Sequence, residues 1–291
     1  MKAVKTVVFS ILMGSLILLS FGDSLCSQMN LSENQRASHF SLSNGLKVIY
    51  QYNPASELTV MQFLIRGGKM AEPQGKDGLA NMMTRLSLEI PDRTTLQKIM
   101  TQATQINMTG SMDYSYLSMA SLSEHFDGTI NLLSKILLKP LFSSIRIDGV
   151  EKAMNRSREF WEEDPLQLAH EKAMEVFYSG TAYSGSIYGQ EDTLKSIKKR
   201  DVDNFYKIHF TAKNTAIFVS SDLDRGTIQK ILEEHFKDIP EGLTIEDEGL
   251  LQALLPEEKS VFIEKETKQN LVLFAYPLPK LTEDNYVLSN L

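Results

Sequence analysis

Hydrophobic and polar residues alternate along this chain with two different periods, which predicts a mixture of strands and amphipathic helices. The dipeptide Asn44-Gly45 is typical of a tight turn between antiparallel strands, and apolar residues occupy every second position on both sides of it. From Phe126 to Leu138 apolar residues instead recur every three or four positions, which predicts a helix with one buried face. On these patterns we predict strands over residues 39–50 (a hairpin), 58–66, 106–112, 114–122 and 215–220, and helices over residues 77–88, 94–104, 126–138, 148–163, 166–178, 201–210 and 225–236.

These strands and helices come in unequal groups, without the regular alternation that builds a parallel α/β sheet. The order predicts an α+β fold in which a largely antiparallel sheet packs against helices. Residues 238–258 are acidic and contain prolines and a glycine, which is typical of a linker, and residues 261–264 and 271–275 are predicted as two strands of a further unit. We therefore divide the chain into a signal peptide (1–26), a polar linker (27–38), an α+β domain (39–240), an acidic linker (241–258) and the start of a truncated second domain (259–291).

The N-terminus has the pattern of a secretory signal peptide. Lys2 and Lys5 precede an apolar run over residues 7–19, and small and polar residues follow it. Because this run falls short of the ~20 apolar residues of a spanning helix, we expect export to a periplasm or to the exterior. A permanent anchor and lipidation at Cys26 are the weaker alternatives. Cys26 is the only cysteine, so the chain forms no intramolecular disulfide, which favours a bacterial periplasm.

Composition and charge exclude one class of partner. Hydrophobic residues make up 42% of the chain, enough to bury a sizeable core. The formal net charge is −7, and the short basic run Lys198-Lys199-Arg200 is typical of a solvated helix end. We expect no nucleic-acid partner.

Several short motifs follow one another in a characteristic order. They are Phe40-x-Leu42-Ser43-Asn44-Gly45-Leu46-Lys47-Val48, Arg66-Gly67-Gly68, Glu72 with Gly78-Leu79-Ala80, Ile106-Asn107-x-Thr109, Asp113-Tyr114-Ser115-Tyr116, Asp164-Pro165, Gly185-x-x-x-Gly189 and Asn214. In type and order they resemble the N-terminal half of a pitrilysin/insulinase-type zinc peptidase, over roughly residues 40–240. The resemblance implies two similar α+β halves that close around an unfolded peptide. The second half is nearly all missing here, although residues 269–273 and 277–279 resemble its opening strand and turn.

The same resemblance identifies a degenerate metal site. In that family Gly-Leu-Ala runs into His-x-x-Glu-His, two histidine ligands and a catalytic glutamate on one helix. On this register Asn81 and Arg85 stand in place of the histidines and Thr84 in place of the glutamate. A guanidinium has no lone pair to donate to Zn²⁺. We therefore expect no catalytic residues at these positions and no cofactor, with zinc present only if the family site is retained in some other way.

The family's remaining ligand is a glutamate on the later long helix. Judged by the distance to Asp164-Pro165, this position falls near Ser157-Arg158-Glu159. Glu159 is a weak candidate ligand that requires a shift in register, and Ser157 or Arg158 is the expected occupant. The five histidines are scattered, with no pair three to five residues apart, so we expect structural or solvent-facing roles for them. They are His39, His125, His170, His209 and His235.

Arg85 has two interpretations. As plain surface structure it pairs with Glu89, one helical turn away. As a functional residue it faces the former metal cavity together with Asn81 and binds a peptide backbone or carboxylate.

The resemblance supports one main functional hypothesis and three alternatives. The main hypothesis is an exported, non-catalytic homologue that pairs with an active zinc peptidase of the same family and helps to hold its peptide substrate. The alternatives are a stand-alone binding or scaffold module, a truncated remnant of a longer gene, and, last, a residual zinc metallopeptidase.

Overall fold

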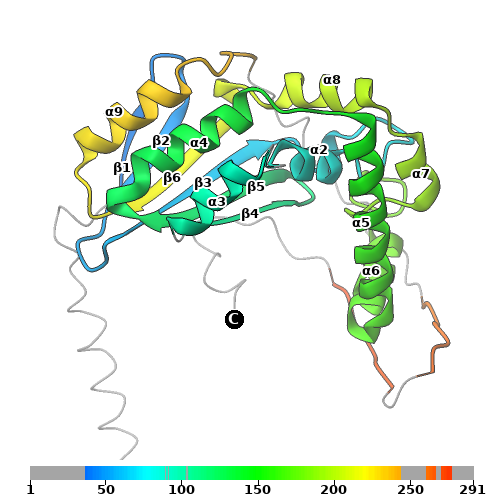
Figure 1. Ribbon diagram of the computed structural model, residues 1–291. Coiled ribbons are helices and arrows are strands. Elements are labelled where there is room, and N and C mark those ends of the chain that lie inside the picture. Colours follow the sequence, from blue (N-terminus) through cyan, green and yellow to red (C-terminus); the bar gives the residue numbers. More distant parts are fainter. Residues whose placement is uncertain are drawn as a thin grey trace, which may run out of the picture.

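A mixed six-stranded sheet organises the fold of the computed structural model, which describes residues 37–88, 90, 92–102, 104–243, 260–266 and 270–276 (Figure 1). The strand order is β1-β2-β6-β3-β5-β4, and the β2–β6 pair is parallel whereas the other four pairs are antiparallel. The predicted α+β fold with a largely antiparallel sheet is therefore confirmed. The strands are β1 Ser38–Ser41, β2 Lys47–Tyr52, β3 Leu58–Arg66, β4 Gln105–Gly110, β5 Tyr114–Leu122 and β6 Thr215–Ser221.

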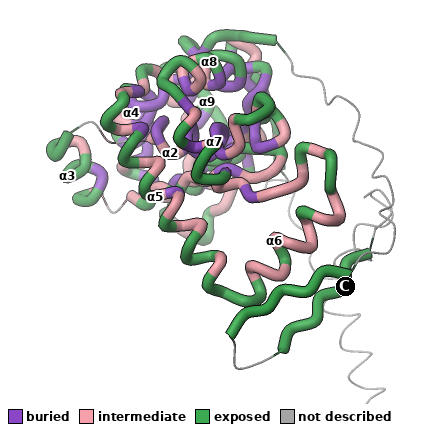
Figure 2. The backbone as a smooth tube through the Cα atoms, turned by 90° about the vertical axis from the view of Figure 1, so that its right-hand side faces the viewer, coloured by how far each residue is buried: buried purple, intermediate pink, exposed green. Residues whose placement is uncertain are grey.

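Helices cover one face of the sheet and continue beyond one of its ends. Helices α4 and α9 lie across one face, while α2, α5, α7 and α8 pack together at the end where β3 and β4 finish (Figure 1). Helices α5 and α6 extend from there as an arm, and α6 contains no buried residue (Figure 2). The helices are α2 Leu79–Ser87, α3 Arg93–Thr101, α4 Phe126–Leu138, α5 Ser144–Glu163, α6 Pro165–Phe177, α7 Glu191–Ser196, α8 Lys199–His209 and α9 Arg225–Phe236, with short 3-10 turns at Lys69–Ala71, Ser123–His125 and Ala212–Asn214.

The main core lies between the sheet and helices α4 and α9. Alternate residues of the strands point into it, as the period of two requires. Phe63 of β3 and Phe236 of α9 are both fully buried, with ring centroids 5.0 Å apart in an edge-to-face arrangement. This contact joins the centre of the sheet to the C-terminal helix of the layer.

The opposite face of the sheet is open. Across the middle of the sheet, Ile49 of β2 pairs with Phe218, Phe218 with Gln62, Gln62 with Ser118, and Ser118 with Asn107. None of these five side chains is buried, and Phe218 is 37% exposed even though β6 is a central strand. The described helices α4 and α9 lie on the other face (Figure 1). We call this surface the open sheet face.

Most predicted elements are confirmed, with boundaries that follow from local geometry. Helix α2 begins at Leu79 rather than residue 77 because Gly78 adopts a left-handed φ of 94°. Helix α5 begins earlier than predicted, because the Ser143 side chain accepts a hydrogen bond from the backbone N–H of Arg146 and caps it there. The short helix α7 was not predicted.

The two strands predicted near the C-terminus are wrong for this structure. Residues 260–266 and 270–276 form no strand and are exposed along their length (Figure 2). An extended segment becomes a strand only when its backbone pairs with a neighbour, and the described residues provide none here. The predicted signal peptide and most of both linkers lie outside the described residues. Among the helices that the structure describes, none combines the length and apolar content needed to cross a membrane.

We expect Phe63→Ala to lower the free energy of unfolding by about 3–5 kcal/mol, because it leaves a cavity against Phe236. Urea denaturation followed by circular dichroism measures this loss. The matched control is Phe218→Ala on the open sheet face, which should cost less than half as much. Equal losses for the two variants would mean that both faces of the sheet are covered.

Candidate functional site

The beginning of helix α2 is held by the partly buried carboxyl group of Glu72. Glu72 accepts hydrogen bonds from the backbone N–H groups of Gly78 (3.0 Å) and Ala80 (2.8 Å), which the first turn of a helix leaves without partners. A side chain at Gly78 would approach the Leu194 side chain to 2.7 Å and the Tyr188 carbonyl oxygen to 3.0 Å. Glycine at this position and Glu72 together set where α2 starts, and therefore which way its later residues face.

Burial raises the pKa of Glu72 from its ordinary 4.5 to about 8. The N–H donors of Ala80 and Gly78 and the nearby Lys69 ammonium act in the opposite direction, by favouring the charged form. Removal from water is the larger effect. Folding therefore stabilises the protonated form of Glu72 across the neutral range.

Asn81, which the resemblance aligns with the family's first histidine ligand, is buried. Both the nitrogen and the oxygen of its side-chain amide form hydrogen bonds inside the protein. Its backbone lies against Gly110 of β4, where an added side chain would come within 3.2 Å of the Asn81 Cα. Its Nδ2 donates to the Ile187 carbonyl oxygen at 3.4 Å, and its Oδ1 accepts a hydrogen bond from Arg85 Nε at 3.3 Å. Both ends of the Asn81 amide are therefore used inside the protein.

Arg85, at the second former histidine position, connects α2 to two other elements. Its Nη2 lies 3.5 Å from the Ser157 hydroxyl of α5, and its guanidinium lies over the Tyr188 ring, 5.8 Å from the ring centroid. The side chain is half-buried. The predicted partner Glu89 lies outside the described residues, so the surface interpretation of Arg85 stays a prediction.

Thr84, which the resemblance aligns with the family's catalytic glutamate, is completely buried. Its Oγ1 lies 2.6 Å from the Ala80 carbonyl oxygen and 2.8 Å from the Ser115 hydroxyl, which itself donates to the Gly67 carbonyl oxygen. A neutral hydroxyl is not among the side chains that act as general bases. Thr84 therefore contributes packing and hydrogen bonding between α2 and β5.

The residues at this site do not fit a zinc ion. Ser157, not Glu159, is the α5 residue that faces Arg85, and Glu159 is exposed. Zn²⁺ in proteins is held by thiolate, imidazole or carboxylate groups. The described residues contain no group of three histidine, cysteine or acidic side chains that could hold a metal. We therefore derive no metal-dependent step at this site.

The histidines lie elsewhere in the fold. His209 is buried, with Nδ1 3.1 Å from the Arg66 carbonyl oxygen and its ring against Phe205, and burial lowers its pKa. His235 of α9 lies 2.9 Å from an Asp127 carboxylate oxygen of α4. Neither residue is part of the Asn81–Arg85 site.

Sequence reasoning missed Ile187 and Tyr188, which cover the site from the loop between α6 and α7. The two glycines on either side, Gly185 and Gly189, were the available signal, and both adopt positive φ angles. A side chain at Gly189 would approach the Asp77 carbonyl oxygen to 2.2 Å. The loop can therefore lie directly on the start of α2 only because this residue is glycine.

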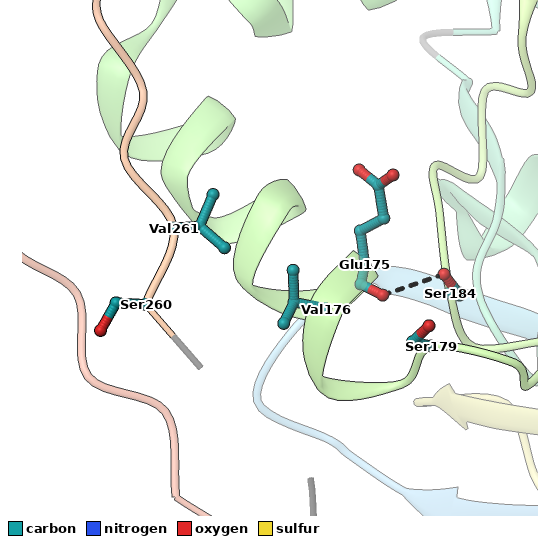
Figure 3. Close-up of a pocket in the computed structure, with 6 residues that line it drawn as sticks. All are labelled: Glu175, Val176, Ser179, Ser184, Ser260 and Val261. Atoms are coloured by element: carbon teal, nitrogen blue, oxygen red, sulfur yellow. Dashed lines mark hydrogen bonds between the residues drawn. The ribbon is translucent and has the colours of Figure 1, made fainter. Parts of the chain in front are cut away.

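A pocket of about 360 Å³ lies apart from this site, between the end of α6 and the C-terminal segment (Figure 3). Glu175 and Val176 of α6 contribute one side and Ser260 and Val261 the other. Its ionisable group, Glu175, is already paired with Lys172 at 2.7 Å. Nothing in this lining points to catalysis.

Comparisons with known proteins show similarity in sequence and in fold to one peptidase family. Residues 47–191 match the family described as "Insulinase (Peptidase family M16)", and residues 196–291 match the "Peptidase M16 inactive domain".

A mitochondrial-processing peptidase subunit beta from Lentinula edodes is 20% identical over 69% of this chain and 44% of its own length. Cytochrome b-c1 complex subunit 1 from Saccharomyces cerevisiae is 19% identical over 66% of this chain and 42% of its own length. Among solved structures, a peptidase M16 inactive domain from Pseudomonas fluorescens superposes with a TM-score of 0.67 at 17% identity, covering 73% of this chain and 53% of that one. The chain thus spans less than half the length of these two curated relatives.

The raised pKa of Glu72 predicts a pH-dependent stability. The folded protein holds a proton on Glu72 that the unfolded chain releases above pH 4.5, so this contribution is present at low pH and is lost as pH rises through about 8. The unchanged protein therefore loses stability as pH rises across this window, whereas Glu72→Gln has no proton to lose at this position. The free energy of unfolding of the variant minus that of the unchanged protein should rise across the window, by at most about 1.4 kcal/mol per pH unit. Urea unfolding at a series of pH values measures the difference. Glu163→Gln, at an exposed position, is the control and should show no such trend.

Proposed function

Because this chain belongs to the insulinase (M16) peptidase family and has an amide and a guanidinium in place of two metal ligands, we propose that it is a non-catalytic, exported member. It binds unfolded peptide segments and acts as the partner of an active zinc peptidase of the same family. One observation carries this proposal. The side chains of Asn81, Arg85 and Ser157 interact with one another where the family's zinc and its three ligands would lie.

Peptide binding is supported by the geometry beside that site. Within the described part of the chain, β4 pairs with β5 alone, so its other edge is an edge of the sheet to which an extended peptide can add as a further strand. The end of β4 at Gly110 lies directly against Asn81. A peptide added to this edge therefore runs beside α2.

The open sheet face is the second observation in favour of the proposed partner role. Its central positions combine apolar side chains with uncharged polar ones, and Tyr116 and Phe218 are 38% and 37% exposed. Exposed apolar side chains that gather on one face are typical of a binding surface. Of the relatives, one is a subunit of the cytochrome b-c1 complex and one is a subunit of a processing peptidase.

Export rests on the N-terminal sequence pattern alone, and cell fractionation with and without residues 1–26 tests it. A stand-alone binding module is the second candidate, because the same edge and face would serve it. A truncated remnant of a longer gene and a residual peptidase are the third and fourth candidates. An intact His-x-x-Glu-His homologue that co-purifies with the chain favours the partner role, whereas a stable monomer that binds peptides alone favours the module.

The non-catalytic assignment predicts that purified, tag-free protein contains far less than stoichiometric zinc and does not cleave peptides. Elemental analysis and a fluorogenic peptide assay measure the two properties. The positive control restores the donors by Asn81→His, Thr84→Glu, Arg85→His and Ser157→Glu, and should gain zinc because Ser157 already faces Arg85. Stoichiometric zinc with chelator-sensitive cleavage in the unchanged protein would overturn the proposal.

If the open sheet face binds unfolded polypeptide, a charged residue placed on that face should weaken the binding. Phe218→Asp should weaken binding of unfolded casein at least about tenfold, because it places an unpaired carboxylate in a surface that becomes desolvated. Fluorescence anisotropy with labelled casein measures the change. Ile208→Asp is the control, since Ile208 of α8 is 59% exposed and lies outside the sheet. Equal effects of the two substitutions would place casein binding elsewhere.

A further inference from the structure

We propose that Arg85, supported by Asn81, Ser157 and Tyr188, is a carboxylate-binding site, so that the former metal site now recognises a negatively charged group of a bound peptide. The inference deepens the proposed function, on which it rests for the nature of the ligand. The carboxylate comes either from the C-terminus of the peptide or from an acidic side chain.

Arg85 has hydrogen-bonding capacity that the protein leaves unused. A guanidinium has five N–H donors, and Arg85 makes two side-chain hydrogen bonds, at 3.3 Å to Asn81 and 3.5 Å to Ser157. Both acceptors are neutral, and no carboxylate in the described part of the chain forms an ion pair with Arg85. Other cations nearby are differently placed: Lys69 pairs with Asp77 at 3.1 Å, Lys76 with Asp201 at 2.9 Å and Arg158 with Glu162 at 3.6 Å.

The surroundings hold the guanidinium in a fixed orientation. Asn81 Oδ1 accepts from Nε, and the Tyr188 ring lies against the guanidinium and contacts the Trp161 ring, with centroids 5.8 Å apart. These contacts leave the terminal nitrogens as the donors for a ligand. Planar pairing with both oxygens of a carboxylate is the interaction for which arginine is suited and lysine is not.

The Ser157 contact is the one that a ligand would replace. Its 3.5 Å length is at the limit of a hydrogen bond, and the Ser157 hydroxyl already donates to the Ala153 carbonyl oxygen at 3.0 Å. A carboxylate oxygen is a stronger acceptor for the same Arg85 N–H. Arg158, the next residue on α5, is already engaged, because it pairs with Glu162 at 3.6 Å and donates to Gln190 Oε1 at 3.2 Å.

The proposed carboxylate-binding site lies next to the end of strand β4. Gly110, the last residue of β4, lies against Asn81, and Asn81 is hydrogen-bonded to Arg85. A strand added to β4 therefore has one end next to the guanidinium. The site is placed to read a terminal carboxylate or an acidic residue at that end of the peptide.

The first measurement is an NMR titration of the full chain with N-acetylglycine, with N-acetylglycinamide as the uncharged control. We expect the Arg85 Nε–H resonance to shift with the acid and not with the amide. The resonance is assigned by its loss in Arg85→Met. If that resonance does not shift at millimolar N-acetylglycine, the carboxylate site is overturned. This conclusion holds whether or not the chain binds peptides.

The second measurement separates the sources of the carboxylate. Labelled short peptides are compared as the free C-terminal acid, as the C-terminal amide, and as the amide with one internal glutamate. We expect one of the two charged peptides to bind at least tenfold more tightly than the plain amide, and Arg85→Met to remove that difference. Arg156→Met is the matched control, because it removes the same charge from an exposed position on α5 and should leave the difference intact.

The outcomes distinguish this inference from the proposed function. Equal binding of all three peptides would overturn the carboxylate site while leaving peptide binding in place. If no peptide binds but N-acetylglycine still shifts Arg85, the carboxylate site stands and the peptide-binding function fails. Loss of the difference in both Arg85→Met and Arg156→Met would show a general charge effect and would also overturn the site.

Discussion

The partly buried carboxyl group of Glu72 determines the position of helix α2, and the geometry of the site follows from it. Its two oxygens accept hydrogen bonds from the N–H groups of Gly78 and Ala80, so the helix must begin where those groups point toward Glu72. From this start, residues four apart fall on one face, and Asn81 and Arg85 turn together toward α5 and the loop at Tyr188. Burial of this carboxyl group raises its pKa, because removal from water is unfavourable for the charged form.

Side-chain contacts join α2 to α5 and β5 at the positions where the family resemblance implies metal-site residues. A zinc ion would hold α2 and α5 together through its ligands, and side-chain contacts do so here. Arg85 reaches Ser157 across the gap, and Thr84 binds Ser115 of β5. Leu79, Met82 and Met83 of α2 pack in one buried cluster with residues of α5 and α8.

The distribution of the helices gives the sheet two different faces. Helices α4 and α9 bury the face that carries Phe63, whereas the face that carries Phe218 stays open over its central strands. A six-stranded sheet with an open face and a free β4 edge offers both side-chain and backbone contacts to a ligand. The proposed peptide binding and partner association would therefore use neighbouring parts of this sheet.

The sequence by itself determined the order of the elements, their class and the absence of ligand chemistry at Asn81 and Arg85. These properties depend on local patterns: periodicity, turn dipeptides such as Asn44-Gly45, and the lone pairs that a side chain has or lacks. Only the tertiary structure decided that Ser157 rather than Glu159 faces Arg85, that Tyr188 lies against the guanidinium, and that residues 261–264 form no strand. Each of these depends on which distant segments meet, and a shift of one or two residues along a helix changes which side chain faces its neighbour without changing the local pattern.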